Sequence, residues 1–322
     1  METLVANRKS SVLGPSTLAC LSDAATINVT LGCAHGCAYC YGRAYQCYPG
    51  HGKVVLYGNL LALARAELPR KKRRPTCAYF CPSCDPFQPI PAVLDSTYEL
   101  MQFFLDEGID VTFLTKGRPP KRFLRLFGCQ PRRVSGQVGL TSLDESFLRL
   151  AEPGAPSPSE RLAGMADLTR LGIPVTLRMD PMWPALTDGD AHLSDLLHAA
   201  KSAGVSGVAA SYLFLRSKLK KPIFSVLAAL GAGAAKCRSM LAEVAPLAID
   251  AKSSKVLALP AAYRKEGYEN ARTIASRFGL PLRICGCKNR DLTAEACGLA
   301  RPSAGWATRI TEGPSGCANT AP

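Results

Sequence analysis

The stretch GCAHGCAYCYGRAY, residues 32–45, carries three cysteines in the spacing Cys-x3-Cys-x2-Cys. These are Cys33, Cys37 and Cys40. Thiolates are the ligands of iron–sulfur clusters, and the glycines of the stretch allow the chain to turn tightly around a cluster. Zinc loops instead favour paired Cys-x2-Cys units. The spacing therefore predicts an iron–sulfur site, in preference to zinc or to unrelated buried thiols. His35, inside the loop, is expected to be a spacer or a hydrogen-bond donor.

Outward from this loop, short β-branched runs alternate with segments of helical length. The candidate strands are Thr26–Thr30, Cys77–Phe80, Asp110–Leu114, Arg133–Leu140, Ile173–Met179 and Val205–Leu213. The candidate helices between them are Leu56–Leu68, Ala92–Glu107, Lys121–Phe127, Ser159–Leu171 and Leu193–Ala203. Strands separated by helices indicate parallel βαβ units. The pattern predicts an α/β fold, a partial (β/α)6 TIM-type barrel with a mainly helical, cysteine-containing C-terminal extension.

The change of pattern along the chain predicts three parts. Residues 1–25 form an N-terminal extension, residues 26–215 the barrel core, and residues 216–322 the C-terminal extension. Within the last part, residues 225–245 indicate one or two helices, residues 269–279 indicate another, and Leu280–Ile284 is a possible short strand. A chain of 322 residues is long enough to bury a core of this size.

The composition is that of a soluble protein with excess positive charge. The formal net charge is +14, and basic residues cluster at Arg70–Arg74 and Lys218–Lys221. Such clusters favour a nucleic-acid partner, although a solvated basic surface is the alternative. No apolar run is long enough to span a bilayer, and the N-terminal stretch lacks an apolar signal core. We therefore expect a cytoplasmic protein without a membrane partner.

The cysteine motif, with an aromatic residue before Cys40, resembles that of the radical S-adenosylmethionine (SAM) superfamily, and the aromatics on both sides of Cys40 resemble its spore photoproduct lyase branch. Further stretches resemble its spore photoproduct lyase branch. They are Asp85–Pro89, Phe113–Lys116, Gly139–Ser142, Glu152–Pro156 with Arg161, Gly172–Pro174 and Asp180–Met182. Together they lie within residues 26–184, a little under half of the chain.

The resemblance implies a [4Fe–4S] cluster held by three thiolates, with its fourth iron open to SAM. One electron, from a donor such as flavodoxin or ferredoxin, would cleave SAM to methionine and a 5′-deoxyadenosyl radical that abstracts hydrogen from substrate. Lys116 and Ser142 match positions that hold the methionine end of SAM in that branch. Tyr41 is a candidate to pack on the cofactor or the cluster.

A second cysteine group, Cys77, Cys81 and Cys84, repeats the spacing of the first. Because Cys77–Phe80 is a predicted strand, Cys77 and Cys81 are expected to share a face. The resemblance makes Cys84 a candidate catalytic hydrogen-atom donor. It directly precedes Asp85, one residue out of register with the lyase, so Ser83 is an alternative equivalent. A second cluster at this group is the less favoured interpretation.

A third group, Cys285, Cys287 and Cys297, follows the possible short strand, and Cys317 lies beyond it. Thiolates in a glycine-rich segment suit an auxiliary iron–sulfur cluster or a structural zinc, but no Cys-x2-Cys pair is present. The pattern predicts a possible second metal site. The lyase branch has no such group, which argues against simple equivalence.

Three functions follow from these features. The leading hypothesis is a radical SAM enzyme acting on nucleic acid, with lyase-like DNA repair as its specific form. The second keeps the radical chemistry but acts on a peptide or small molecule with the help of an auxiliary cluster. The third is an iron–sulfur or zinc protein that binds nucleic acid without catalysis.

Overall fold

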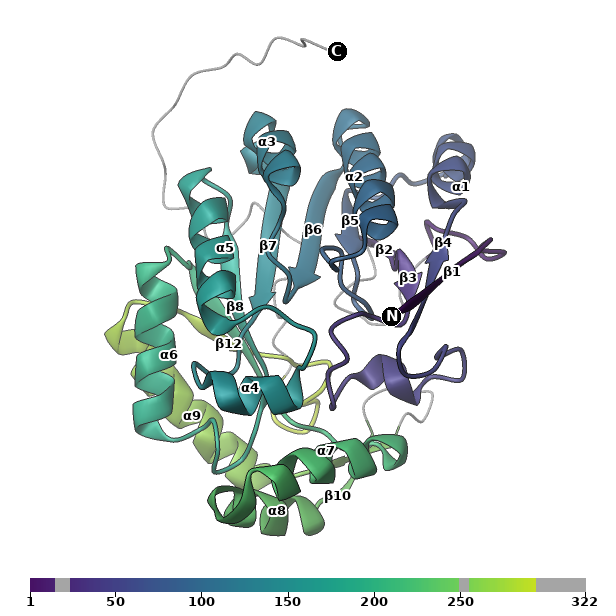
Figure 1. The fold of residues 1–322 in the computed structure, drawn as a ribbon. Coiled ribbons are helices and arrows are strands. Elements are labelled where there is room, and N and C mark those ends of the chain that lie inside the picture. Colours follow the sequence, from purple (N-terminus) through teal and green to yellow (C-terminus); the bar gives the residue numbers. More distant parts are fainter. Residues whose placement is uncertain (15–23, 249–254, 294–322) are drawn as a thin grey trace.

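The computed structural model describes residues 1–14, 24–248 and 255–293. Its main sheet has seven strands in the order β2-β5-β6-β7-β8-β9-β12, and every neighbouring pair is parallel (Figure 1). The strands are β2 Ala24–Ile27, β5 Cys77–Phe80, β6 Asp110–Thr115, β7 Val134–Gly139, β8 Val175–Met182, β9 Gly207–Tyr212 and β12 Leu282–Ile284. The predicted α/β fold, a partial TIM-type barrel, is confirmed.

Helices connect the strands on the outer side of the sheet (Figure 1). They are α1 Leu60–Glu67, α2 Pro91–Asp106, α3 Lys121–Cys129, α4 Glu145–Ala151, α5 Pro158–Arg170 and α6 Asp190–Ser202. Phe113, Phe123 and Phe127 are fully buried in the core between the sheet and these helices. Helix α5 begins at Ser157 in a capping box with Glu160, since each side chain accepts from the other residue's backbone N–H. Of the six, only α4 was absent from the prediction, because a two-turn helix carries little periodicity.

A small sheet that the sequence did not predict brackets the cysteine loop. Its strands are β1 Glu2–Ala6, β4 Lys53–Tyr57 and β3 Thr30–Leu31, in the order β1-β4-β3. The predicted strand Thr26–Thr30 is therefore divided between two sheets, and β4 takes the start of the predicted helix Leu56–Leu68. The loop leaves β3 at Gly32, whose φ is +77°, and a Cβ there would lie 2.6 Å from the Lys53 carbonyl oxygen. Only glycine fits this close approach.

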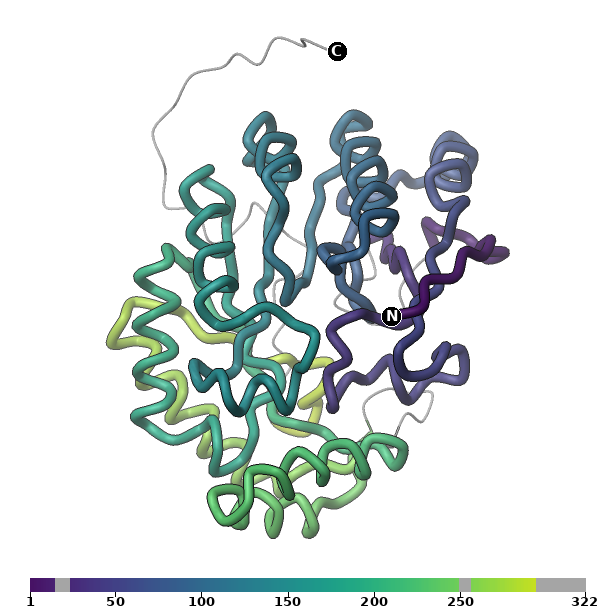
Figure 2. The backbone as a smooth tube through the Cα atoms, in the orientation of Figure 1, coloured from purple at the N-terminus to yellow at the C-terminus, as the bar shows by residue number. Residues whose placement is uncertain are grey.

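The C-terminal region is mainly helical, as predicted. It comprises α7 Ser217–Ala229, α8 Ala235–Ala242, the antiparallel strands β10 Ala245–Ala248 and β11 Lys255–Ala258, and α9 Ala261–Arg277. The possible short strand is confirmed as β12, which pairs in parallel with β9 and so returns to the barrel. Helix α7 lies at the same end of the sheet as the cysteine loop (Figure 2) and contacts the 3-10 helix η2 Tyr41–Ala44. The division of the chain into three parts remains a prediction.

None of the helices in the described part of the chain combines the length and the apolar character that a membrane span requires.

Candidate active site

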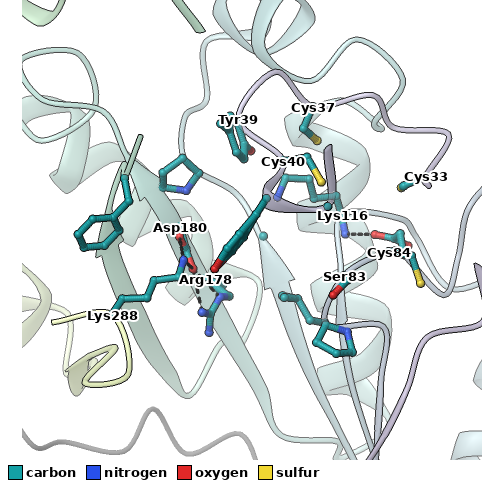
Figure 3. A pocket seen from close by; sticks show the side chains of 18 of the residues that line it. Cys33, Cys37, Tyr39, Cys40, Ser83, Cys84, Lys116, Arg178, Asp180 and Lys288 are labelled. Carbon is teal, nitrogen blue, oxygen red and sulfur yellow. Dashed lines mark hydrogen bonds and ion pairs between the residues drawn. The ribbon is translucent and has the colours of Figure 1, made fainter. Parts of the chain in front are cut away.

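A cavity of about 280 Å³ lies at the carboxyl ends of the barrel strands, where enzymes of this architecture carry their active sites. The cysteine loop lines one side of it with Cys33, Cys37 and Cys40 (Figure 3). Lys116, directly after β6, and Cys84, after β5, line the same cavity. The fold thus brings together residues that the sequence singled out more than 80 positions apart.

The three loop thiols fit an iron–sulfur cluster. Within the described residues, no three His, Cys, Asp or Glu side chains form a group that could hold one metal ion. The three thiols line one cavity together, and thiolates are the ligands that iron–sulfur clusters take. Burial raises the pKa of Cys33 and Cys37, so their thiolates need the positive charge that irons supply. His35 also lines the cavity, and its buried Nε2 has no partner among the described residues.

Asp85 and Gln88 fix the loop relative to the strand ends. The Asp85 carboxylate accepts from the backbone N–H of Lys116 at 2.6 Å and lies 3.4 Å from His35 Nδ1. The Gln88 side chain accepts from the Ala34 N–H at 2.8 Å. Burial lowers the pKa of His35, so this histidine is neutral near pH 7. The Asp85–Pro89 motif therefore positions both the cysteine loop and Lys116.

A buried carboxylate, Glu152, lies beneath the loop. Arg161 Nη1 is 2.5 Å from Glu152 Oε2, Lys116 Nζ is 3.9 Å from Oε1, and the Tyr39 hydroxyl donates to Oε1. Burial opposes ionisation of Glu152, but Lys116 and Arg161 outweigh it and hold its pKa below the usual range. Arg161 also donates to the carbonyl oxygen of Gly139 at 3.0 Å. Glu152 and Arg161 thus form an ion pair that joins the loop to the barrel.

The chain on both sides of Glu152 packs directly on the loop backbone. Gly154 N–H donates to the His35 carbonyl at 2.9 Å, and Ala38 N–H donates to the Ala151 carbonyl at 2.8 Å. A Cβ at Gly154 would lie 2.2 Å from the carbonyl oxygen of Ala34. The glycine in the Glu152–Pro156 motif is therefore required by close backbone contact.

The predicted SAM-binding residues are only partly brought together. Lys116 lines the cavity, with Nζ 5.5 Å from the centre of the Tyr39 ring. Tyr41 also lines it, between the guanidinium of Arg216 at 5.1 Å and Nζ of Lys288 at 5.5 Å. Ser142 is buried, accepts from the Asp144 N–H at 2.9 Å and is not among the residues that line the cavity.

Sequence reasoning missed a charged cluster on the opposite wall, formed by Arg178, Asp180 and Lys288 (Figure 3). Asp180 Oδ2 lies 2.8 Å from Arg178 Nη2 and 2.7 Å from Lys288 Nζ. Burial opposes ionisation of Asp180, but Lys288 and Arg178 overcome it and lower the pKa to about 2. Charged residues at the end of predicted strand Ile173–Met179 were a usable signal. No sequence feature marked Lys288, because only the pairing of β12 with β9 brings this residue to the cavity wall.

The remaining cysteines are distributed differently from the prediction. Cys285 and Cys287 line the same cavity, while Cys297 and Cys317 lie outside the described residues. Cys77 and Cys81 do not share a face, since Cys77 packs with Tyr79 and Cys285, whereas Cys81 belongs to the main core. The expectation failed because the strand ends at Phe80 and Cys81 adopts φ +62°, which breaks the alternation.

This fold and loop define a barrel enzyme of the iron–sulfur type, and comparison with known families agrees. A model of the radical SAM superfamily matches residues 27–197, more than half of the chain. The chain belongs to the radical SAM superfamily. Membership implies a [4Fe–4S] cluster and SAM as cofactors.

Individual relatives have diverse descriptions. An uncharacterized protein of Mycobacterium tuberculosis is 32% identical over 208 residues, which cover 61% of this chain and 60% of that protein. A radical SAM Nα-GlyT isomerase of Pseudomonas phage M6 is 29% identical over 52% of this chain and 35% of its own. Spore photoproduct lyase complexed with dinucleoside spore photoproduct matches 88% of this chain and 82% of its own, with a TM-score of 0.66 and 15% identity. That likeness shows the fold.

Gly154→Ala is expected to displace the cysteine loop, because its new Cβ would collide with the Ala34 carbonyl. After anaerobic reconstitution, the variant should bind markedly less iron per chain than the wild type. Gly233→Ala is the matched control, since its Cβ would meet nothing within 4 Å. Equal iron in both variants, with both folded by circular dichroism, would contradict the assigned contact.

Glu152→Gln is expected to lower the free energy of unfolding by about 3 kcal/mol at pH 7, because Arg161 stays buried without its carboxylate. The pKa of Glu152 lies below its usual value. The stabilisation is therefore complete above about pH 4.3 and is lost as the pH falls through the lowered pKa. Urea unfolding across this range measures it. Glu145→Gln, at an exposed pair with Arg149, should change little, and a pH-independent loss at Glu152 would refute the assignment.

Proposed function

We propose that this protein binds a [4Fe–4S] cluster through Cys33, Cys37 and Cys40, cleaves SAM reductively, and acts on a nucleic-acid base. The observation that carries the proposal is that these thiols share one cavity with Lys116 and Cys84. With both cofactors bound, reductive cleavage would supply a 5′-deoxyadenosyl radical that takes a hydrogen atom from the substrate. The fold match to spore photoproduct lyase and the phage isomerase relative support radical chemistry of this kind.

In this proposal, Lys116 binds the carboxylate of SAM. Its contact with Glu152 is long, at 3.9 Å, so the ammonium group retains donors for a ligand in the cavity. Attraction to the buried Glu152 carboxylate helps to keep the pKa of Lys116 above its usual value despite burial, which ensures that the cation is present. Asp85 holds the backbone of Lys116 and thereby fixes where this cation meets the ligand.

Cys84 is proposed as the hydrogen-atom donor to a substrate radical. It lines the cavity from the end of β5, and its thiol lies 3.7 Å from Asn28 Oδ1. A thiol at this place could return a hydrogen atom to a carbon radical formed beside it. Lyase-like repair of a DNA lesion is the specific form of the reaction that the resemblance favours.

A nucleic-acid substrate is supported by positive charge beside the cavity. Lys218, Lys220 and Lys221 are exposed on the first turns of α7, at the cavity end of the barrel. Arg216 lines the cavity, and its buried Nε has no hydrogen-bond partner among the described residues. Arg70–Arg74 instead precedes β5 and so lies at the amino ends of the strands. We therefore assign phosphate contacts to the α7 cluster alone.

Anaerobic reconstitution with dithionite and SAM tests the enzyme. The wild type should form 5′-deoxyadenosine, and replacement of Cys33, Cys37 and Cys40 by alanine should abolish it. Cys129→Ala, at an exposed cysteine, is the control. Lys116→Met should raise the KM for SAM about tenfold, since it removes a charge-assisted hydrogen bond. A protein that holds its cluster but forms no 5′-deoxyadenosine would instead be a non-catalytic binding protein.

Iron counting tests the alternative of an auxiliary cluster, which the position of Cys285 and Cys287 in the cavity wall favours. If the alternative holds, the variant without the three loop cysteines keeps the iron of one [4Fe–4S] cluster. We expect instead that the variant without the three loop cysteines loses all its iron. The double variant Cys285→Ala, Cys287→Ala should bind as much iron as the wild type.

Charge reversal tests the substrate class. Replacing Lys218, Lys220 and Lys221 by glutamate should weaken binding to duplex DNA and make the dependence of log K on log salt shallower, by roughly 0.9 for each phosphate that is no longer neutralised. Fluorescence anisotropy over a salt series measures this slope. The matched control reverses Arg70, Lys72 and Arg74 at the other end of the barrel and should leave the slope nearly unchanged. An unchanged slope in the α7 variant would exclude these phosphate contacts.

A further inference from the structure

The turn Cys81-Pro82-Ser83-Cys84 leaves β5 and forms part of the cavity wall. Both cysteines are free thiols. Cys81 adopts φ +62°, a left-handed conformation that is uncommon outside glycine and is held only where surrounding contacts determine it. These contacts are visible, since Cys81 N–H donates to the Ile27 carbonyl at 2.7 Å and Ser83 N–H donates to Asn28 Oδ1 at 2.9 Å.

This backbone turn places the two thiols close enough for each to shift the pKa of the other. They differ in access. Cys81 is completely buried, at 0% exposure, whereas Cys84 is partly exposed and lines the cavity. Cys77, the third cysteine of this group, packs elsewhere and donates to Thr112 Oγ1 at 3.4 Å. The turn therefore presents a pair of thiols and not a three-cysteine metal site.

The two thiols also differ in acidity, in the direction typical of a reactive dithiol. Burial opposes ionisation of Cys84, but hydrogen bonds from Cys81 and Thr30 lower its pKa. Burial and the neighbouring Cys84 raise the pKa of Cys81. An accessible thiol of lowered pKa beside a buried partner is the arrangement of Cys-x2-Cys oxidoreductase motifs.

We propose that Cys81 and Cys84 form a redox-active dithiol that closes reversibly to a disulfide, with Cys84 as the reacting thiol and Cys81 as the resolving thiol. The inference rests on the proposed function in one respect, the role of Cys84 as hydrogen-atom donor. A disulfide removes the S–H hydrogen from Cys84, so the donor exists only in the reduced form. Cys81 thus sets whether the cavity can complete a radical reaction.

The chemistry balances with a small disulfide as oxidant, such as oxidised glutathione. The Cys84 thiolate attacks one sulfur of that disulfide, which forms a mixed disulfide and releases one glutathione thiolate. The Cys81 thiolate then attacks Cys84 Sγ, which forms the Cys81–Cys84 bond and releases the second glutathione. The protons of the two cysteines end on the two glutathione thiols. The protein loses two electrons and the oxidant gains them.

The experiment equilibrates the cluster-bearing protein anaerobically in glutathione buffers of varied ratio, followed by acid quenching, alkylation and peptide mass spectrometry. The wild type should convert to a Cys81–Cys84 disulfide along a two-electron curve, with little glutathione retained. Cys81→Ser should instead trap one glutathione on Cys84, since the resolving thiol is gone. Cys84→Ser should leave Cys81 unmodified because it is buried. Cys129→Ser is the control and should titrate like the wild type.

The wild-type curve decides the proposal even if a variant fails to fold. The proposal is overturned if Cys81 and Cys84 are both still reduced, and therefore alkylated, at the most oxidising glutathione ratio. A stable mixed disulfide between glutathione and Cys84 of the wild type would also overturn it. 5′-Deoxyadenosine formation is measured on a separate portion of the same protein preparation, which is not quenched or alkylated. Its absence together with a normal disulfide curve would reject the enzyme function and leave the dithiol standing. Formation of 5′-deoxyadenosine without a Cys81–Cys84 disulfide would reject the dithiol and leave the enzyme function standing.

Discussion

The buried Glu152 carboxylate is the interaction on which the rest of the site depends. It receives Arg161 from α5, Lys116 from the end of β6 and Tyr39 from the cysteine loop. Removing one partner from a buried ion pair costs far more than the pair contributes, because the charge that remains has no water. The network therefore holds three separate segments in one arrangement. The position of the cysteine loop is therefore fixed by its contacts with the barrel as well as by its own short turns.

The cavity combines two walls of different chemistry. On one wall, buried thiols have raised pKa values and need positive charge. On the other, Asp180 is shared by Arg178 and Lys288, and Tyr41 lies between Arg216 and Lys288. The single charge of Asp180 balances only one of its two cations, and Arg216 adds a further positive charge to the same cavity. The cavity wall beside α7 therefore carries net positive charge.

The relatives share the barrel more widely than they share sequence. A match at 15% identity still covers 88% of this chain, because a parallel barrel is specified by apolar strands that tolerate many exchanges. Three contacts around the loop place strict physical demands on the residues that make them. Gly154 contacts the loop backbone, Asp85 holds the Lys116 backbone, and Glu152 and Arg161 are buried together. The C-terminal region contributes Cys285 and Lys288 to the cavity wall.

By itself, the sequence determined the barrel strands, most of their helices and the cysteine loop, because hydrophobic period and residue spacing are local properties. Lys116 was indicated by the resemblance to a known family. The sequence did not reveal the small sheet around the loop, the face of Cys81, or that Ser142 is not among the residues that line the cavity. Each of these depends on contacts between segments far apart in the chain. Lys288 reaches Asp180 only because β12 pairs with β9, and Cys81 meets Cys84 only because tertiary contacts hold a left-handed turn. Neither the strand pairing nor the contacts that hold the turn can be predicted from the local sequence, because both join segments far apart in the chain. The tertiary structure decided both.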